Sequence, residues 1–261
     1  IEYFISYYRI PVSQLLPYNA LIVPFAYFFY HNMDKPTGAK QKYLQDYFWR
    51  CALSGRFSSS VETKLGQDVK RIDAILNEEL PKYDWTIDIS EEGIINHGWF
   101  SAGRSYIKAI LCIYAYQQPK SFNDGSLVNI SNYWLKQANS KNYHHFFPKA
   151  YLAKQNTDFF HVNHIANITI VDDFLNKREI GAKSPAVYMR KFIKQNEDIE
   201  TTMKSHLIND LEAFGILEND YDRFFEKRII AIHKELKKRI ILQDSDEITN
   251  VSLPSNEDTV E

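Results

Sequence analysis

Apolar residues recur at helical spacing along most of the chain. Over residues 61–80 they stand three or four apart and therefore share one face of a helix: Val61, Leu65, Val69, Ile72, Leu76 and Leu80. Further helices are predicted at 41–53, at 101–116, from Pro185 behind a Ser184 cap, from about 198 to Gly215, and over 221–242. The pattern predicts a mainly α-helical protein.

Two segments interrupt the helical pattern and suggest how the chain is divided. Residues 81–100 contain turn residues and a short alternating run, which is typical of a connector, and residues 119–140 carry the turn signal "NDG". We therefore predict a helical domain at 1–125, a second domain at 126–243 and an acidic, disordered tail at 244–261. Because the chain opens on Ile1 within what looks like structure, we expect a fragment of a larger protein.

Composition and charge exclude several classes of protein. Apolar residues make up 44% and charged residues 25%, as in ordinary globular proteins. The net charge is −2, and the six acids of the last eighteen residues leave +4 on residues 1–243, which permits a polyanionic partner without requiring one. The longest apolar run, residues 20–30, is too short for a membrane span, and no secretion signal is evident. Cys51 and Cys112 stand in apolar contexts that favour burial, so a cytoplasmic location is expected.

The last predicted helix has two different faces. An apolar stripe is formed by Phe225, Ile229, Ile232, Leu236 and Ile240. The opposite face is basic, with Arg228, Lys234, Lys237 and Lys238. These charges indicate either a solvated surface or a contact with nucleic acid.

Two adjacent histidines in "NYHHFFP", residues 142–148, are the strongest chemical signal. Downstream, "NITIV" predicts a strand that starts at Asn167. Asp172 or Asp173 can then cap a short helix that contains Asn176 and Lys177. The predicted order is strand, loop, strand and short helix, with histidines on the first strand and an asparagine on the helix.

This order of residues suits metal-assisted hydrolysis of a phosphodiester. An imidazole with an ordinary pKa of about 6.5 is largely neutral at pH 7 and can accept a proton from water. A second imidazole and an amide oxygen can hold a divalent cation and leave positions open for water and phosphate, as magnesium or manganese prefers.

The same residues resemble a known family. "HHFFP" followed by "IANITIVDDFLNK" is similar to the HNH, or ββα-metal, nuclease signature, and more closely to the C-terminal nuclease region of GmrSD-type and SspE-like restriction and phage-defence proteins. The strict match covers residues 143–185. It includes an asparagine before the second strand and another asparagine nine positions later. The resemblance implies a helical body with a small ββα-metal nuclease motif.

The resemblance also implies a role for each matched residue. His145 would be the general base, Asn167 would brace its loop, and His144 and Asn176 would be the metal ligands. Because the first ligand is histidine rather than an acid, zinc and nickel remain alternatives to magnesium and manganese. Contacts to DNA are expected from basic residues around the motif: Lys149, Lys177, Arg178 and Lys183. Cleavage in such proteins leaves 5′-phosphate and 3′-hydroxyl ends.

Several alternatives stay open at this point. The nucleotide-hydrolysing domain that precedes the nuclease in this family is absent from the chain and is expected as a partner. RNA in place of DNA shares all the chemistry, and the sequence does not predict the oligomeric state. His161 and His164 are less favoured as further metal ligands. A non-catalytic interaction domain that keeps a degenerate ββα unit is the competing hypothesis, and it gains if His144 turns into the aromatic core.

Overall fold

Helices make up most of the secondary structure. The computed structural model describes residues 1–11, 13–130, 143–171, 179–244 and 246. Within these ranges the α-helices are α1 (Glu2–Ser6), α2 (Ile22–His31), α3 (Gly38–Leu53), α4 (Val61–Leu76), α5 (Glu91–His97), α6 (Ser105–Tyr116), α8 (Lys149–Ala153), α9 (Phe159–Val162), α10 (Pro185–Gln195), α11 (Ile199–Lys204) and α12 (Tyr221–Lys237). The strands are β1 (Tyr143–His145) and β2 (Ile168–Ile170), and the 3₁₀ turns are η1 (Ser13–Leu15), η2 (Asn19–Leu21), η3 (Arg56–Ser58) and η4 (Ile165–Asn167).

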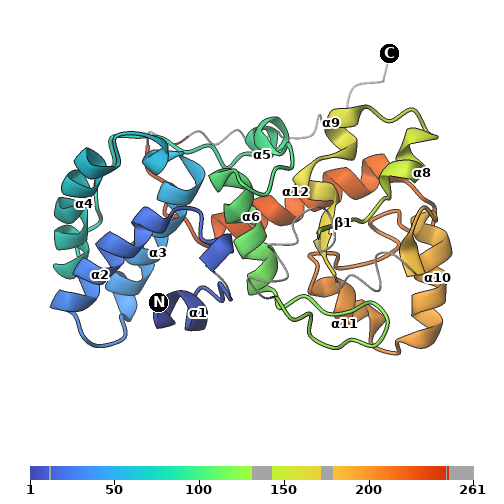
Figure 1. Ribbon diagram of the computed structural model, residues 1–261, viewed down its shortest axis with the longest axis horizontal. Helices are drawn as coiled ribbons and strands as arrows, with labels where there is room; N and C mark the ends of the chain where they lie inside the picture. The colour runs from blue at the N-terminus through green and yellow to red at the C-terminus, as the bar shows by residue number, and fades with distance from the viewer. Residues whose placement is uncertain (12, 131–142, 172–178, 245, 247–261) are drawn as a thin grey trace, which may run out of the picture.

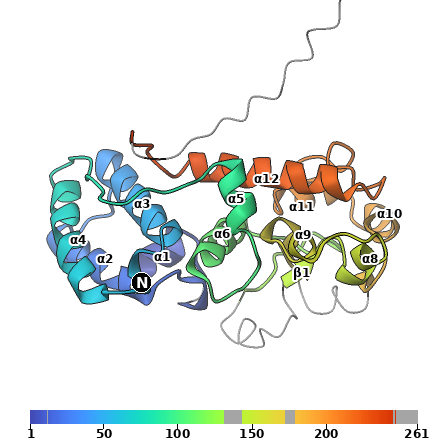
Figure 2. The same ribbon diagram turned by 90° about the horizontal axis from the view of Figure 1, so that it is seen from above.

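The helices are arranged along the longest axis of the molecule (Figure 1). Helices α1 to α4 form one end, the strands and α8 to α11 form the other, and α5 and α6 lie between them. Helix α6 contacts both α3 and β2, and α12 contacts α5 and η4. Figure 2 shows α12 running along one face from the middle to the far end. Buried apolar residues from Tyr3 to Ile240 form one continuous core, so the division between residues 125 and 126 stays a prediction.

Local sequence signals correctly predicted where two helices begin. Helix α10 begins at Pro185 as predicted, with Ser184 at the N-cap position but without a capping hydrogen bond from its side chain. Helix α12 begins behind Asp220, whose Oδ1 accepts a hydrogen bond from the Arg223 N–H at 3.0 Å. The predicted apolar stripe of this helix is buried along its whole length, which confirms the helical phase.

Two local predictions were wrong, and a third was confirmed only in part. The helix expected from 198 to Gly215 ends at Lys204, because Leu207 takes a left-handed backbone conformation with φ of 57°. The connector at 81–100 contains α5, whose N-terminus is capped by the Ser90 hydroxyl accepting from Gly93 N–H at 2.9 Å. On α4 most of the predicted apolar stripe packs on the core, but Val69 is exposed while the neighbouring Asp68 is buried.

One residue of the predicted tail is fixed against the helical body. Arg50 of α3 is buried and forms ion pairs with Asp46 at 3.0 Å and with Asp246 at 2.5 Å. A buried guanidinium needs compensating charge, which explains why the chain returns to α3 after α12. The prediction of disorder from residue 244 is therefore wrong for Asp246, and residues 247–261 lie outside the described residues.

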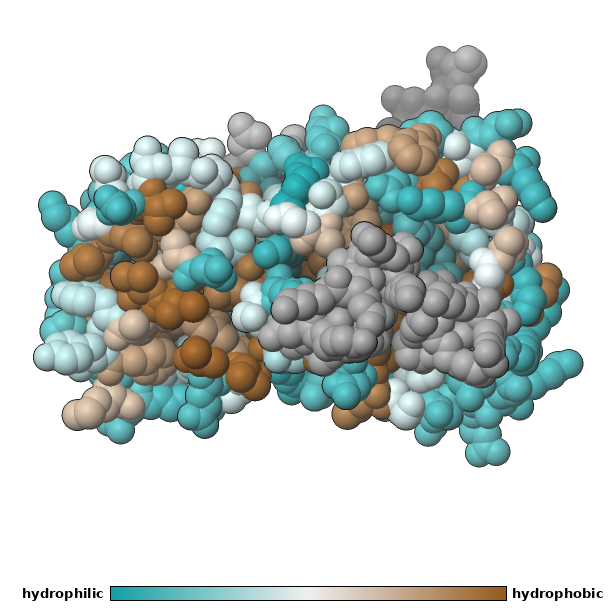
Figure 3. All heavy atoms as spheres, in the orientation of Figure 1, coloured by the Kyte–Doolittle hydropathy of each residue, from teal (hydrophilic) through white to brown (hydrophobic). Residues whose placement is uncertain are grey.

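Among the described residues, no helix is both long enough and apolar enough to span a bilayer. Apolar side chains do gather on the surface formed by α1 and α2 (Figure 3). The exposed apolar residues of these two helices include Ile5 at 51%, Ile22 at 41% and Val23 at 52%.

Candidate active site

The two-stranded sheet places the adjacent histidines on opposite faces. Strands β1 and β2 are antiparallel, with His144 opposite Thr169 and His145 opposite Ile168. Because successive side chains of a strand point to opposite sides, the two imidazoles have different surroundings. His144 lies toward α10, where its ring centroid is 6.4 Å from that of Tyr188, while His145 lies toward Phe100 at 6.5 Å.

The His145 side chain is partly exposed and held by an amide. Its Nε2 lies 3.1 Å from Oδ1 of Asn163, and Nδ2 of Asn163 donates to the Phe100 carbonyl at 3.1 Å. Burial and, to a smaller extent, the nearby Lys149 ammonium lower the pKa of His145, the hydrogen bond with Asn163 opposes them, and the resulting pKa is about 4. The imidazole is therefore neutral at pH 7.

Asn167 fastens the loop that follows His145. Its side chain is fully buried, its Oδ1 accepts from Phe147 N–H at 2.8 Å, and its Nδ2 donates to the carbonyls of Phe147 at 3.0 Å and Val162 at 3.1 Å. The Asn167 carbonyl in turn accepts from Phe146 N–H at 2.8 Å. The Asn167 side chain, one residue before β2, thus connects the loop after β1 to the end of α9.

His144 is buried, with 3% of its surface exposed. The hydroxyl of Thr169 donates to its backbone carbonyl at 3.4 Å. Asn176, the other predicted ligand, lies outside the described residues, so their convergence on one cation stays a prediction. Among the residues that the structure describes, no group of three or more His, Cys, Asp or Glu side chains is arranged to hold a metal ion. One imidazole is compatible with a divalent cation but does not define a site for it.

The basic residues predicted to contact DNA are only partly described. Lys149, the first residue of α8, is exposed, its Nζ lies 5.9 Å from the centre of the Phe159 ring, and partial desolvation lowers its pKa. Lys183 is exposed and donates to the Glu179 carbonyl at 2.8 Å. Lys177 and Arg178 lie outside the described residues. On α12 the three predicted lysines are exposed: Lys234, Lys237 and Lys238.

Arg228 does not belong to a basic surface, and this prediction is corrected. Its side chain is fully buried and donates to the carbonyls of Ala166 at 3.0 Å, Ile168 at 2.8 Å and His206. Its guanidinium carbon lies 4.7 Å from the centre of the Tyr114 ring, and burial lowers its pKa. The residue thus anchors η4 and β2 to α12. Its position four residues after Phe224, on the apolar side of the helix, was the available signal.

The two downstream histidines are structural in different ways. His164 is fully buried, its Nδ1 accepts from Ala166 N–H at 3.0 Å, and its Nε2 donates to the Ile95 carbonyl at 3.1 Å. Burial lowers its pKa to about 4. His161 is partly exposed and is paired with Asp158. Asn163, one of the two residues between them, contacts His145, although no pattern in the sequence marks a single asparagine at this position.

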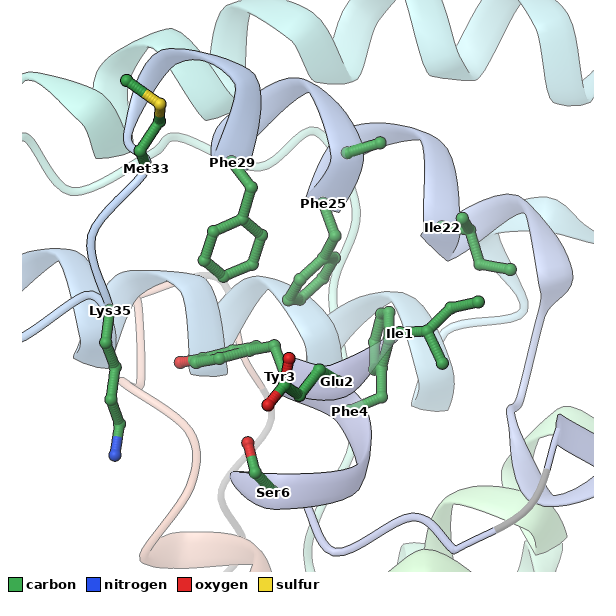
Figure 4. A pocket seen from close by; sticks show the side chains of 11 residues that line it. Ile1, Glu2, Tyr3, Phe4, Ser6, Ile22, Phe25, Phe29, Met33 and Lys35 are labelled. Carbon is green, nitrogen blue, oxygen red and sulfur yellow. The ribbon is translucent and has the colours of Figure 1, made fainter.

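An apolar cavity of about 450 Å³ lies at the opposite end of the molecule, between α1 and α2 (Figure 4). Tyr3, Phe4, Phe25 and Phe29 line it. None of the predicted site residues contributes to this cavity. It is therefore separate from the surroundings of His145.

The chain is similar to an archaeal protein over most of its length. The chain is 27% identical over 254 residues to the uncharacterized protein MJ0686 of Methanocaldococcus jannaschii. The match covers 89% of this chain and 41% of that protein, so the chain spans about two fifths of its relative's length. No protein-family model matches the sequence, and no solved structure matches it.

Proposed function

We propose that the chain is a metal-dependent endonuclease that hydrolyses phosphodiester bonds in DNA. The observation that carries the proposal is the state of His145: a partly exposed, neutral imidazole whose Nε2 is engaged by a buried amide. It lies at the end of β1, beside a loop that Asn167 holds by three hydrogen bonds. A base for hydrolysis needs both a free lone pair and a fixed direction.

In the proposed reaction, Nδ1 of His145 takes a proton from the attacking water. The lowered pKa keeps the imidazole unprotonated at neutral pH, although it also makes the imidazole a weaker base. A phosphate bound nearby would bring negative charge and raise this pKa towards the working range. The exposed ammonium of Lys149, close enough to affect His145 electrostatically, is suited to bind that phosphate.

The proposed metal site and the rest of the motif are based on the resemblance to ββα-metal nucleases. The antiparallel pair β1–β2 is in the predicted order, and the helix that would complete a ββα unit falls mostly on residues 172–178, outside the described residues. His144 and Asn176 would hold the cation. When bound, a magnesium or manganese ion would neutralise charge that develops on the leaving oxygen. A role in restriction or phage defence, together with a nucleotide-hydrolysing or sensor domain, belongs to the same proposal.

The second candidate function, an interaction domain without catalysis, has observations of its own. His144 is buried beside Tyr188, and exposed apolar side chains gather over α1 and α2. A ligand to a catalytic cation has to meet solvent or substrate on one side, so a His144 that stays closed off would favour this candidate.

A plasmid-nicking assay separates the two candidates. Supercoiled DNA is incubated with the chain and magnesium or manganese, with EDTA as the metal-free control. We expect metal-dependent nicking that is lost in His145→Ala and kept in His31→Ala, a change at an exposed histidine far from the sheet. If the wild-type chain and His145→Ala are equally inert with both metals, the proposal of an active nuclease in this chain fails.

A further inference from the structure

We infer that Asn163 is a positioning residue that fixes the ring orientation and the tautomer of His145, with the proton on Nε2 and the lone pair on Nδ1. The structural part of this inference stands alone, whereas its consequence for cleavage rests on the proposed function. Asn163 contacts His145 and Phe100. It lies two residues before η4, outside the histidine motif itself.

The direction of the Asn163 amide follows from its second partner. The Phe100 carbonyl can only accept a hydrogen bond, so the group 3.1 Å away must be the NH₂ of Asn163. The Oδ1 of Asn163 therefore faces Nε2 of His145, also at 3.1 Å. An amide oxygen has no proton to give, so Nε2 must carry the hydrogen. In a neutral imidazole this leaves Nδ1 unprotonated.

The backbone around Asn163 prevents the amide from turning away. Asn163 is 7% exposed, and its own carbonyl accepts from Phe100 N–H at 2.9 Å. The neighbouring residue His164 forms an antiparallel bridge with Trp99, and Ile165 N–H donates to the Gly98 carbonyl at 2.8 Å. The segment 98–100 thus fixes the backbone of residues 163–165, and it connects the helical body to His145 through Asn163.

A flipped amide would lose the hydrogen bond to the Phe100 carbonyl and would force the other tautomer on His145. Its oxygen would face the Phe100 carbonyl, and its NH₂ would face Nε2 of His145, which would then have to be the acceptor. The proton would move to Nδ1, and the ring would present a donor where the proposed reaction needs a base. Fixing the partner of one ring nitrogen in this way decides which nitrogen is available for chemistry.

The tautomer can be measured directly by nitrogen NMR on the whole chain with ¹⁵N-labelled histidine, without metal, at neutral pH. The signal of His145 is assigned by its loss in His145→Ala. Other histidines serve as internal references, because the carbonyls they face fix their tautomers: Nδ1–H for His97 and His233, and Nε2–H for His206. We expect the Nε2–H pattern for His145, and an Nδ1–H pattern would overturn the inference.

Two variants extend the test. Asn163→Leu has a similar volume and no acceptor, so the fixed tautomer should be lost; Asn163→Asp keeps an acceptor and should retain it.

In cleavage assays Asn163→Leu should lower kcat roughly a hundredfold with little change in KM, with Asn163→Asp less affected. If the wild-type tautomer is Nε2–H but no form cleaves DNA, the proposed function fails and the positioning inference stands. If Asn163→Leu folds and keeps a pure Nε2–H signal, Asn163 is not what fixes the ring.

Discussion

Replacing Asn167 with aspartate tests the hydrogen bonds that hold the loop of the candidate site. The change is nearly isosteric. In Asn167→Asp one oxygen can still accept from Phe147 N–H, but the other faces the carbonyls of Phe147 and Val162 with no donor between them. The position is fully buried, so water cannot replace the lost donors.

The magnitude follows from the protonation state that the carboxyl must take. Two carbonyl oxygens nearby and burial raise the pKa of this carboxyl above its unfolded value of about 3.9, so the folded variant keeps it protonated. Holding it neutral at pH 7 costs up to about 4 kcal/mol. The protonated group can donate to one carbonyl only, and the other, left unpaired, costs about 1–3 kcal/mol. The expected loss is roughly 5–7 kcal/mol at pH 7 and about 1–3 kcal/mol near pH 4.

Urea denaturation followed by tryptophan fluorescence measures this difference at each pH. Asn209→Asp, which makes the same change in charge at an exposed position, is the matched control and should stay within about 0.5 kcal/mol of the wild type. The deficit of Asn167→Asp should shrink as the pH falls, since the group with the raised pKa gains its proton. A variant within about 1 kcal/mol of the wild type at pH 7, or a deficit that grows on acidification, would refute the reasoning.

Three other predictions concern packing, protonation and nucleic-acid binding. In Gly98→Ala the added Cβ would lie 1.8 Å from Nε2 of the buried His164, so urea denaturation should show a free energy of unfolding lower by about 3 kcal/mol. Gly66→Ala, in the open part of α4, is the control and should be neutral or stabilising. Burial lowers the pKa of His206 to about 4, so as the pH falls the unfolded chain binds a proton at this residue before the folded chain does. The free energy of unfolding therefore falls between about pH 6.5 and pH 4. In His206→Gln, thermal melts across that range should show up to about 3 kcal/mol less of this fall in stability. If Lys149 binds phosphate, Lys149→Gln should weaken DNA binding and reduce the salt dependence by about one ion, measured by fluorescence anisotropy, and an unchanged slope would exclude the contact.

The fold could be predicted where the signal was local. Ser184 with Pro185 located the start of α10, and the apolar stripe located α12, because caps and periodicity act over a few residues. The expected stop at Gly215 failed because the chain turns earlier, at Leu207, where a long-range contact is made: the neighbouring His206 hydrogen-bonds with the Lys120 carbonyl at 2.7 Å. Such contacts leave no periodic mark in the sequence.

The candidate site, like the fold, could be predicted only where the signal was local. His145 and Asn167 could be named from a compact motif, but their surroundings are built by residues far along the chain. Asn163 depends on Phe100, 63 positions away, and Arg228 depends on carbonyls of residues about 60 positions earlier. A basic residue on an amphipathic helix is usually solvated, and the sequence gives no sign of the carbonyls of η4 and β2 that receive the buried Arg228 side chain.

Chemical rescue of His145→Gly by free imidazole is the most direct test of the central claim. The variant is assayed on supercoiled DNA with excess magnesium or manganese, over a series of imidazole concentrations, beside the wild-type chain. We expect the variant to be inactive alone and to regain metal-dependent nicking as imidazole increases, because the added base occupies the space of the lost ring. A His145→Gly variant that nicks DNA as fast as the wild type would contradict the account, as would a wild-type chain that fails to cleave with either metal.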